Sequence, residues 1–358
     1  MPSQNYQLIG LMSGTSGDGL DIALCQFQKK NSWEYEILQA ATIPFPDKLG
    51  KSLQASHQLT ALELHLLDVD FGRWIGSEVK AFCERHQAAP LAVCSHGHTV
   101  FHQPKKGLSL QIGNGWAIQQ ASRLKVINDF RMKDVQLGGQ GAPLVPIGDQ
   151  ELFPEMDFCI NLGGISNISM DHLGKRIAFD VSPFNLLLNP IAQTLGAEFD
   201  HSGKWASEGN VQPELLEQLN QLDFYQQSGA KSLGREDLEQ DFLPLIDRSS
   251  ASSKDKLATL TEHYAVQMSR VIRQFAARES PKVLITGGGA YHDHFIDRLD
   301  AHLEGSWDYS QADTNLIEFK EALIFAFLGH LRLLGIDNCL ASVTGASHNS
   351  CGGTIYEN

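Results

Sequence analysis

The segment LIGLMSGTSGDGLDIALCQF, residues 8–27, places a turn rich in Gly, Ser, Thr and Asp between two short apolar runs. The runs at 8–12 and 20–24 have the length of strands, so the segment predicts a β-hairpin. Glycine-rich tips expose backbone N–H groups that can form an anion-binding concavity, although an ordinary tight turn has the same composition. The tip carries Gly14, Gly17 and Gly19, the hydroxyls of Ser13, Thr15 and Ser16, and the carboxylates of Asp18 and Asp21.

The bulk composition predicts a soluble globular protein of two domains. A chain of 358 residues exceeds the usual size of one hydrophobic core, and its hydrophobic content is 42%. No apolar run has the length of a membrane helix, and the N-terminal residues do not resemble a secretory leader. We therefore expect no membrane partner and a cytoplasmic location.

Charge and cysteine spacing narrow the function classes. The formal net charge of -14 argues against binding to nucleic acid. The six cysteines are widely spaced and include no C-x-x-C pair, which favours reduced thiols over disulfides or a zinc site.

Strand-like runs followed by glycine-rich turns recur at 92–102, 158–170 and 282–291. Helical periodicity occurs at 61–86 and 257–280, and strands that alternate with helices indicate an α/β architecture. The stretch 247–256 has a loop composition. The segment INLGGISNISM repeats the strand, polar turn and strand of the first hairpin. Two such hairpins, one from each of two similar halves, could hold a polyphosphate.

Two familiar phosphate-binding motifs are excluded. The tripeptide GKS at 50–52 lacks the P-loop glycine five residues earlier, where Phe45 stands. The glycine pairs at 113–115 and 287–289 do not complete G-x-G-x-x-G, because Ile118 and His292 occupy the last position.

Several segments, in order and over nearly the whole chain, resemble the 1,6-anhydro-N-acetylmuramic acid kinase family. They are GLMSGTSGDGLD, SHGHTVFH, LQIGN, NDFRMKDVQLGGQGAPLVP, INLGGISNIS, AFDVSPFN, KSLGRE, TGGGAYH and SVTGAS. The resemblance implies two RNase H-like domains of the actin-like ATPase superfamily around a central nucleotide cleft. It assigns 1–130 with 341–358 to the first domain and 131–340 to the second, and it implies a homodimer.

The resemblance also implies an ATP site, with Mg²⁺ held through Asp18 or Asp21. Met12 stands where members of this superfamily often have an aspartate. The segment KSLGRE at 231–236 is a further candidate for contact with the nucleotide. The implied nucleotide-binding residues are Gly14, Thr15, Ser16, Gly17, Asp18, Gly19, Leu20 and Asp21 in the first hairpin, Asn161, Gly163, Gly164 and Asn167 in the second, and Gly287, Gly288 and Gly289.

Asp180 is the candidate catalytic base. In the family, an aspartate activates the water that attacks the anomeric carbon while the released oxygen takes the γ-phosphoryl group. By its residues alone, Asp180 follows the apolar run 177–179 and lies at an expected strand end, where a helix cap or a turn residue is the alternative.

Four residues are implied to bind the sugar. Arg131 can hold a carboxylate such as that of a lactyl ether, but it can also lie alone on the surface or pair with Asp129. Glu321 can instead serve the dipole of a helix that begins near it. The resemblance assigns sugar contacts to His96 and Gly97, whereas the histidines at 96, 98 and 102 could be mistaken for a metal site.

The chain departs from the family around the candidate base. Val181, Ser182 and Phe184 replace a threonine and two glycines, Asn114 replaces an aspartate, and Asn189 stands where an aspartate is common. Phe184 either occupies space near the sugar or packs into the core. Alternatives to the kinase are a kinase of a different anhydro-sugar and a nucleotide-binding relative with little or no activity.

Overall fold

The computed structural model describes residues 6–13, 19–227 and 231–357. They form two compact units, unit 1 with 1–154 and 319–358 and unit 2 with 155–318. The expected boundaries at 130/131 and 340/341 differ from this division. Residues from Phe319 onward fall in unit 1 because their helix packs directly on its sheet: a side chain at Gly10 would overlap the backbone of Ala322.

Unit 1 is built on a six-stranded sheet of order β13-β7-β4-β1-β2-β3. The strands β1, β2 and β3 are antiparallel neighbours, whereas β4 and β7 run parallel to β1. The expected first hairpin is confirmed, since β1 pairs with β2 from Tyr6↔Phe27 to Ser13↔Leu20. The strands are β1 (Tyr6–Ser13), β2 (Gly19–Lys29), β3 (Trp33–Pro44), β4 (Ala92–Ser95), β7 (Lys125–Asn128) and β13 (Thr354–Tyr356), with β5 (His98–Gln103) and β6 (Leu108–Ile112) in a separate two-stranded sheet.

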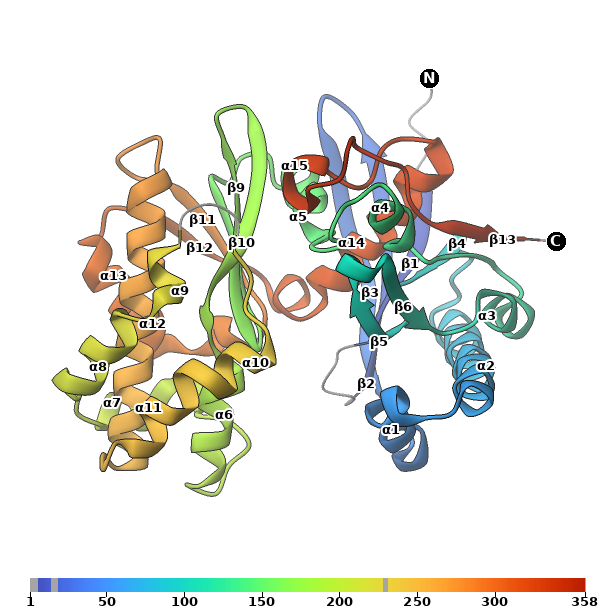
Figure 1. The fold of residues 1–358 in the computed structure, drawn as a ribbon. Coiled ribbons are helices and arrows are strands. Elements are labelled where there is room, and N and C mark those ends of the chain that lie inside the picture. Colours follow the sequence, from blue (N-terminus) through green and yellow to red (C-terminus); the bar gives the residue numbers. More distant parts are fainter. Residues whose placement is uncertain (1–5, 14–18, 228–230, 358) are drawn as a thin grey trace. The chain divides into compact units, whose positions relative to one another are not determined.

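Helices cover both faces of the unit 1 sheet. The apolar side chains of β1 and β2 pack with Phe71, Ile75 and Val79 of α2 in one buried cluster, and α2 lies beside α3 (Figure 1). On the other face, α14 approaches β4 so closely that a side chain at Gly329 would overlap the Cys94 thiol. The helices are α1 (Asp47–Gln54), α2 (Ala61–His86), α3 (Gly115–Ser122), α4 (Met132–Gln136), α5 (Val145–Leu152), α14 (Thr314–Leu334) and α15 (Ala341–Thr344), with short 3₁₀ turns η1 (Ser56–Gln58) and η2 (Pro104–Lys106).

Unit 2 repeats the topology of unit 1. Its sheet has the order β10-β9-β8-β11-β12, with three antiparallel strands followed by two that run parallel to the first. The two hairpins also share a register: Asn161↔Asn167 is the pair before the last, as Met12↔Asp21 is in unit 1. The internal repeat expected from the sequence is thus confirmed. The strands are β8 (Phe158–Leu162), β9 (Ile165–His172), β10 (Lys175–Pro183), β11 (Lys282–Thr286) and β12 (Asp308–Gln311).

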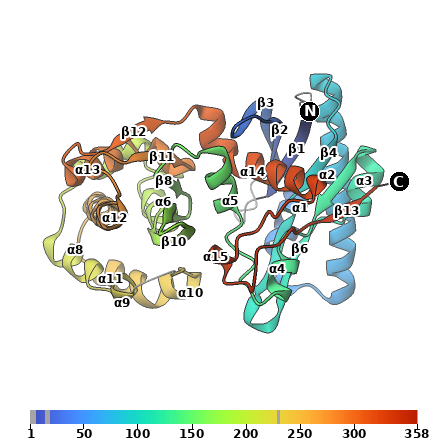
Figure 2. The same cartoon turned by 90° about the horizontal axis from the view of Figure 1, so that it is seen from above.

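The long helix α12 organises the core of unit 2. It contacts β10, α6, α7, α8 and α13, and Figure 2 shows it end-on. It runs from Ser253 to Phe275 rather than over 257–280, because the Ser252 hydroxyl accepts the Asp255 N–H at 3.2 Å and starts the helix earlier than expected. The loop expected at 247–256 is correspondingly short. The remaining elements are α6 (Asn185–Gln193), η3 (His201–Gly203), α7 (Lys204–Glu208), α8 (Pro213–Asn220), α9 (Asp223–Gln226), α10 (Arg235–Asp237), the π-helical turn η4 (Leu238–Phe242), α11 (Leu243–Arg248), α12 (Ser253–Phe275), η5 (Gly288–Tyr291) and α13 (Asp293–Leu303).

Candidate active site

A row of polar side chains crosses four strands of the unit 2 sheet. Thr286 of β11 lies opposite Asn161 of β8, Asn161 opposite Asn167 of β9, and Asn167 opposite Asp180 of β10. Residues directly opposite in paired strands point to the same face. The sheet therefore brings three of the expected site residues together: Asn161, Asn167 and Asp180.

Asp180 is held at a β-bulge. The register of β10 against β9 shifts between Asp180 and Ser182, so Val181 is the extra residue. The Asp180 carboxylate accepts the Leu233 N–H at 2.9 Å, and the Asp180 N–H donates to the Lys231 carbonyl at 2.9 Å. Asp180 is not a helix cap, since Phe184 is the N-cap residue of the following helix α6.

Burial sets the acidity of Asp180. Removing the carboxylate from water raises its pKa from 3.8 to about 6, and the Leu233 N–H opposes only part of that rise. A carboxyl group with this pKa is ionised at neutral pH and accepts a proton readily. Asp180 thus has the properties of a general base.

The segment KSLGRE lies against the candidate base. Its Lys231 carbonyl and Leu233 N–H make the two backbone hydrogen bonds to Asp180 described above. The Lys231 ammonium donates to the Phe224 carbonyl at 3.1 Å and lies over the Phe224 ring. In this unit the segment positions Asp180, a role that the sequence did not suggest.

The tip of the second hairpin is tied to the start of α6. The Gly164 carbonyl accepts the N–H groups of Phe184 and Leu186, and the Gly163 carbonyl accepts that of Asn185. A side chain at Gly164 would press on Leu186, with its Cβ 3.0 Å from the Leu186 Cγ. The two tip glycines therefore lie on the loop that follows Asp180.

The glycine loop after β11 packs on the same hairpin. Gly287 has φ +82°, and a Cβ there would lie 2.6 Å from the Asn161 Oδ1. A Cβ at Gly289 would lie 2.5 Å from the Phe184 Cε1. Gly288 is exposed, and its added Cβ would have only Asn185 nearby, at 3.9 Å. Among the three glycines expected to contact the nucleotide, Gly288 is therefore the one whose backbone has open space beside it.

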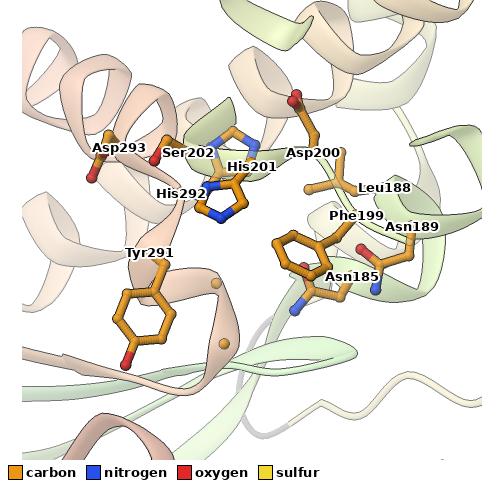
Figure 3. A pocket seen from close by; sticks show the side chains of 12 residues that line it. Asn185, Leu188, Asn189, Phe199, Asp200, His201, Ser202, Tyr291, His292 and Asp293 are labelled. Carbon is orange, nitrogen blue, oxygen red and sulfur yellow. The ribbon is translucent and has the colours of Figure 1, made fainter. Parts of the chain in front are cut away.

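A cavity of about 550 Å³ opens beside Gly288 and Gly289 (Figure 3). This volume is in the range of small-molecule sites. Phe199 and Tyr291 expose large fractions of their rings at its wall, 51% and 38%. None of the lining residues is Lys or Arg. They are Asn185, Leu188, Asn189, Phe199, Asp200, His201, Ser202, Gly288, Gly289, Tyr291, His292 and Asp293.

In unit 1, Arg131 and His96 form a bonded pair. The guanidinium donates from Nε and Nη2 to the His96 Nε2, at 3.0 and 2.8 Å. The His96 Nδ1–H therefore donates to the Gly97 carbonyl, 2.8 Å away. Burial and the Arg131 charge hold the pKa of His96 well below its usual range, so the ring is neutral.

Arg131 is thus neither alone on the surface nor paired with Asp129. Its Nη1 donates to the Gly141 carbonyl at 2.8 Å, and burial lowers its pKa to about 10, which still leaves it charged at neutral pH. Because His96 takes the Nε and Nη2 edge, a bound carboxylate would meet the outer Nη1 and Nη2 edge instead.

Glu321 belongs to the same electrostatic cluster. Burial raises its carboxyl pKa, and the charge of Arg131 opposes that rise. The expected alternative, a first-turn residue serving the helix dipole, is wrong, because α14 begins at Thr314 and Glu321 lies inside it. Unit 1 therefore brings together three expected sugar-binding residues, His96, Arg131 and Glu321, with Gly97 next to His96.

The three histidines of SHGHTVFH do not form a metal site. His98 contacts the Ser13 hydroxyl at 3.4 Å and His102 the Ser109 hydroxyl at 3.0 Å, whereas His96 faces Arg131. Within 6–13, 19–227 and 231–357, no group of three His, Cys, Asp or Glu side chains is placed to hold a metal ion.

Of the nucleotide-binding residues expected in the first hairpin, the structure describes Gly19, Leu20 and Asp21. The Asp21 carboxylate accepts the Thr42 hydroxyl at 2.6 Å, and Leu20 is buried in the core. A Cβ at Gly19 would lie 2.8 Å from the Ile43 carbonyl oxygen. Gly14, Thr15, Ser16, Gly17 and Asp18 lie outside the described residues.

Packing or hydrogen bonding accounts for three of the departures from the family pattern, at Phe184, Val181 and Asn114. Phe184 is fully buried against Tyr264 and Phe295, so the alternative of a core role is confirmed. Val181 is buried as well. In unit 1, Asn114 caps α3 and donates from Nδ2 to the Asp68 carboxylate at 3.1 Å, a contact in which an aspartate would be repelled.

Sequence reasoning missed the walls of the unit 2 cavity. Phe199, His201 and Ser202 follow α6 in a stretch with no motif, and their place depends on its packing against η5 and α13. One signal was present: His292 stands three residues after the glycine run and directly before a helical pattern, the place of a capping residue.

The fold and the site define the class. Two units repeat one RNase H-like order of strands, and the second holds the half-buried Asp180 carboxylate with its raised pKa; this is the two-domain architecture of the actin-like sugar kinases and ATPases. Residues 6–358 match the model of the family described as anhydro-N-acetylmuramic acid kinase. The chain belongs to that family.

Curated relatives agree with this assignment. Each of the following is named anhydro-N-acetylmuramic acid kinase. The protein from Picosynechococcus sp. is 36% identical over 95% of this chain and 96% of its own length. That from Pseudomonas fluorescens is 34% identical over 98% and 99%. That from Vibrio vulnificus strain YJ016 is 32% identical over 97% of both.

Solved structures resemble the chain only distantly. A hexokinase from Schistosoma mansoni complexed with glucose aligns with 90% of this chain and 85% of its own, at 11% identity and a TM-score of 0.43.

Proposed function

We propose that the protein is an ATP-dependent kinase that opens 1,6-anhydro-N-acetylmuramic acid with water and phosphorylates it at O6, in cell-wall recycling. Water adds to the anomeric carbon, the C1–O6 bond breaks, and O6 takes the γ-phosphoryl group of ATP. The products are N-acetylmuramic acid 6-phosphate and ADP. Family membership supports the kinase activity and the sugar.

The environment of Asp180 is the observation that carries the proposal. Its carboxyl group is half-buried, has a pKa of about 6 and is anchored by the Leu233 N–H through one oxygen. In the proposed reaction it takes the proton of the attacking water. Because Val181 and Phe184 turn into the core, the altered loop leaves this carboxylate in place. That supports an active kinase over an inactive relative.

The unit 1 cluster is the proposed sugar site. The outer edge of the Arg131 guanidinium offers two N–H groups to the lactyl carboxylate. His96, fixed as the neutral Nδ1–H tautomer, holds that guanidinium in orientation. Glu321 and the Gly97 backbone complete the set.

The nucleotide residues of unit 2 fit ATP in their chemistry. Gly288 offers backbone without a side chain beside the 550 Å³ cavity, and His292 has a buried nitrogen at the same wall without a hydrogen-bond partner among the described residues. Asn161, Gly163, Gly164 and Asn167 are proposed to contact the phosphates, with residues 14–21 of the first hairpin. Gly287 and Gly289 keep the glycine loop in place.

Mg²⁺ would be held mainly by phosphate oxygens and water, with Asp21 and Asp18 as the proposed carboxylate contacts. When bound, it neutralises charge on the phosphates during transfer. The Asp21 carboxylate, fixed by Thr42, is a suitable oxygen ligand for such a contact.

The proposal is tested by turnover in ¹⁸O-labelled water. Purified protein with ATP, Mg²⁺ and the anhydro-sugar is expected to release ADP and to form a sugar 6-phosphate labelled at C1. Asp180→Asn should keep ADP binding and lose roughly 10² to 10⁴-fold in turnover, because an amide does not accept the proton. Asp247→Asn, an exposed carboxylate in the same unit, serves as the matched control. Label found only in phosphate would mean simple ATP hydrolysis and would exclude this mechanism.

The cytoplasmic location and the homodimer are parts of the same proposal. The six cysteines are all free thiols, which supports a reducing compartment. No helix in the described part of the chain is long and apolar enough to cross a membrane. Light scattering on the purified protein measures the subunit number directly.

A further inference from the structure

His292 lies where the glycine loop meets α13, and one of its ring nitrogens is already committed. It is the N-cap residue of α13, and its Nδ1 accepts the Phe295 N–H at 3.1 Å. A nitrogen that accepts an N–H carries no proton, and burial lowers the pKa of the ring to about 4. At neutral pH, His292 is therefore the neutral tautomer with its proton on Nε2.

That second nitrogen is a buried donor without an acceptor. The side chain is 6% exposed, and Nε2 has no hydrogen-bond partner among the described residues. The carboxylate of the nearby Asp200 accepts the N–H groups of Trp205 and Ala206 instead. A buried donor left unpaired costs about 1–3 kcal/mol, so such groups usually meet a ligand or water.

Capping alone does not explain an imidazole at this position. Asn, Asp and Ser are better N-cap residues, and each would satisfy the Phe295 N–H. The ring is also tightly enclosed, since a Cβ at Gly203 would overlap its Cε1. The additional feature of His292 is the N–H at the wall of the 550 Å³ cavity, where Figure 3 shows the ring between Tyr291 and Phe199.

The lining favours a flat, uncharged ring over a phosphate. Phe199, Tyr291 and Leu188 supply apolar surface, and stacking on aromatic rings suits a nucleobase. Asp200 and Asp293 are the charged side chains in the wall, and no Lys or Arg is present to offset an anion. The ring nitrogens of a purine are acceptors that match a donor N–H.

We propose that the Nε2–H of His292 donates a hydrogen bond to a ring nitrogen of the adenine base and so makes this residue a determinant of nucleotide specificity. The inference rests on the proposed ATP-dependent function. It adds a residue that recognises the adenine base and also caps the N-terminus of α13.

Binding of ADP, measured by calorimetry, tests the proposal. His292→Asn keeps the cap and removes the Nε2 donor, so affinity should fall roughly 5- to 30-fold while the melting temperature is unchanged. His292→Ser introduces another capping side chain that is too short to reach the base, so it should lower ADP affinity by a similar factor and also leave the melting temperature unchanged. His294→Asn, the same change two residues on and outside the cavity wall, is the matched control.

Deaza analogues identify the contact. One of the analogues 1-, 3- and 7-deaza-ADP should bind the wild type more weakly than ADP does, by the same factor that His292→Asn costs. His292→Asn itself should bind that analogue as tightly as it binds ADP. Wild-type affinity for ADP in both capping variants, or three analogues that are equally weakened in wild type and variant, would overturn the inference while leaving the kinase proposal intact. A wild type that neither binds ADP nor transfers phosphate would instead refute the proposed function, and the inference with it.

Discussion

Asp180 shows how one residue acquires its chemistry from its neighbours. Its carboxylate is ionised at neutral pH but protonates about two pH units above an exposed aspartate, because it is half-buried and receives one backbone N–H. When the pH falls below about 6, the Asp180 carboxylate becomes protonated. The protonated form cannot accept the proton of water.

We therefore expect kcat/KM for the anhydro-sugar to fall below an apparent pKa near 6, tenfold for each pH unit. Burial holds the pKa values of His96 and His98 below their usual range, so the titration of these rings should not cause the fall in kcat/KM near pH 6. The pH–rate profile of the wild type measures this fall, and the residual activity of Asp180→Asn should not show it. A profile flat from pH 5 to 8 would contradict the assignment.

Arg131 gives a second prediction at this scale. A lysine cannot reproduce the two hydrogen bonds that converge on the His96 Nε2 together with a third to the Gly141 carbonyl. Arg131→Lys should raise the KM for the sugar roughly 10- to 100-fold and leave the KM for ATP unchanged. Steady-state kinetics measure both constants. Arg85→Lys, an exposed arginine of α2, is the control, and an equal rise in both KM values would argue against a sugar contact.

The secondary-structure elements with a local sequence pattern were predictable from the sequence, whereas the contacts between distant elements were not. The strands of both hairpins were predictable because apolar runs bounded by Gly, Ser and Asn have a local signature. The position of Asp180 near the end of β10 was predictable for the same reason. The hydrogen bond from the Leu233 N–H to Asp180 was not predictable, because it joins residues 53 positions apart and no local sequence pattern links them. The core role of Phe184 depends likewise on Tyr264 and Phe295, which lie on α12 and α13.

The loop after β10 provides the prediction for this scale. Because Phe184 is fully buried and its ring contacts Gly289, Phe184→Ala should lower the free energy of unfolding by about 3–5 kcal/mol. Val181→Thr with Ser182→Gly and Phe184→Gly, which would restore the family residues, should also destabilise rather than increase turnover. Phe199→Ala, which removes a half-exposed ring in the same unit, is the control. Urea denaturation measures all three, and a change under 1 kcal/mol in Phe184→Ala would be inconsistent with this packing.

At the scale of the whole molecule, the proposed site residues belong to two different units. Asp180 belongs to unit 2, whereas His96, Arg131 and Glu321 belong to unit 1. Phosphoryl transfer is favoured where water is excluded, so enzymes of this kind commonly close over their substrates.

We expect ADP and the anhydro-sugar together to reduce the radius of gyration more than either alone. Small-angle scattering measures this, and Asp180→Asn with ATP and the sugar allows the same measurement with the reaction halted. Each ligand alone is the control. A radius that does not change when both are bound would contradict closure.

The matching register of the two hairpins has an evolutionary consequence. Met12↔Asp21 and Asn161↔Asn167 occupy the same place in two sheets of one topology, as expected if an ancestral gene half this length was duplicated and fused. Fusion freed the copies from being identical. One half has a carboxylate at this place and the other has two amides, so the two halves could specialise.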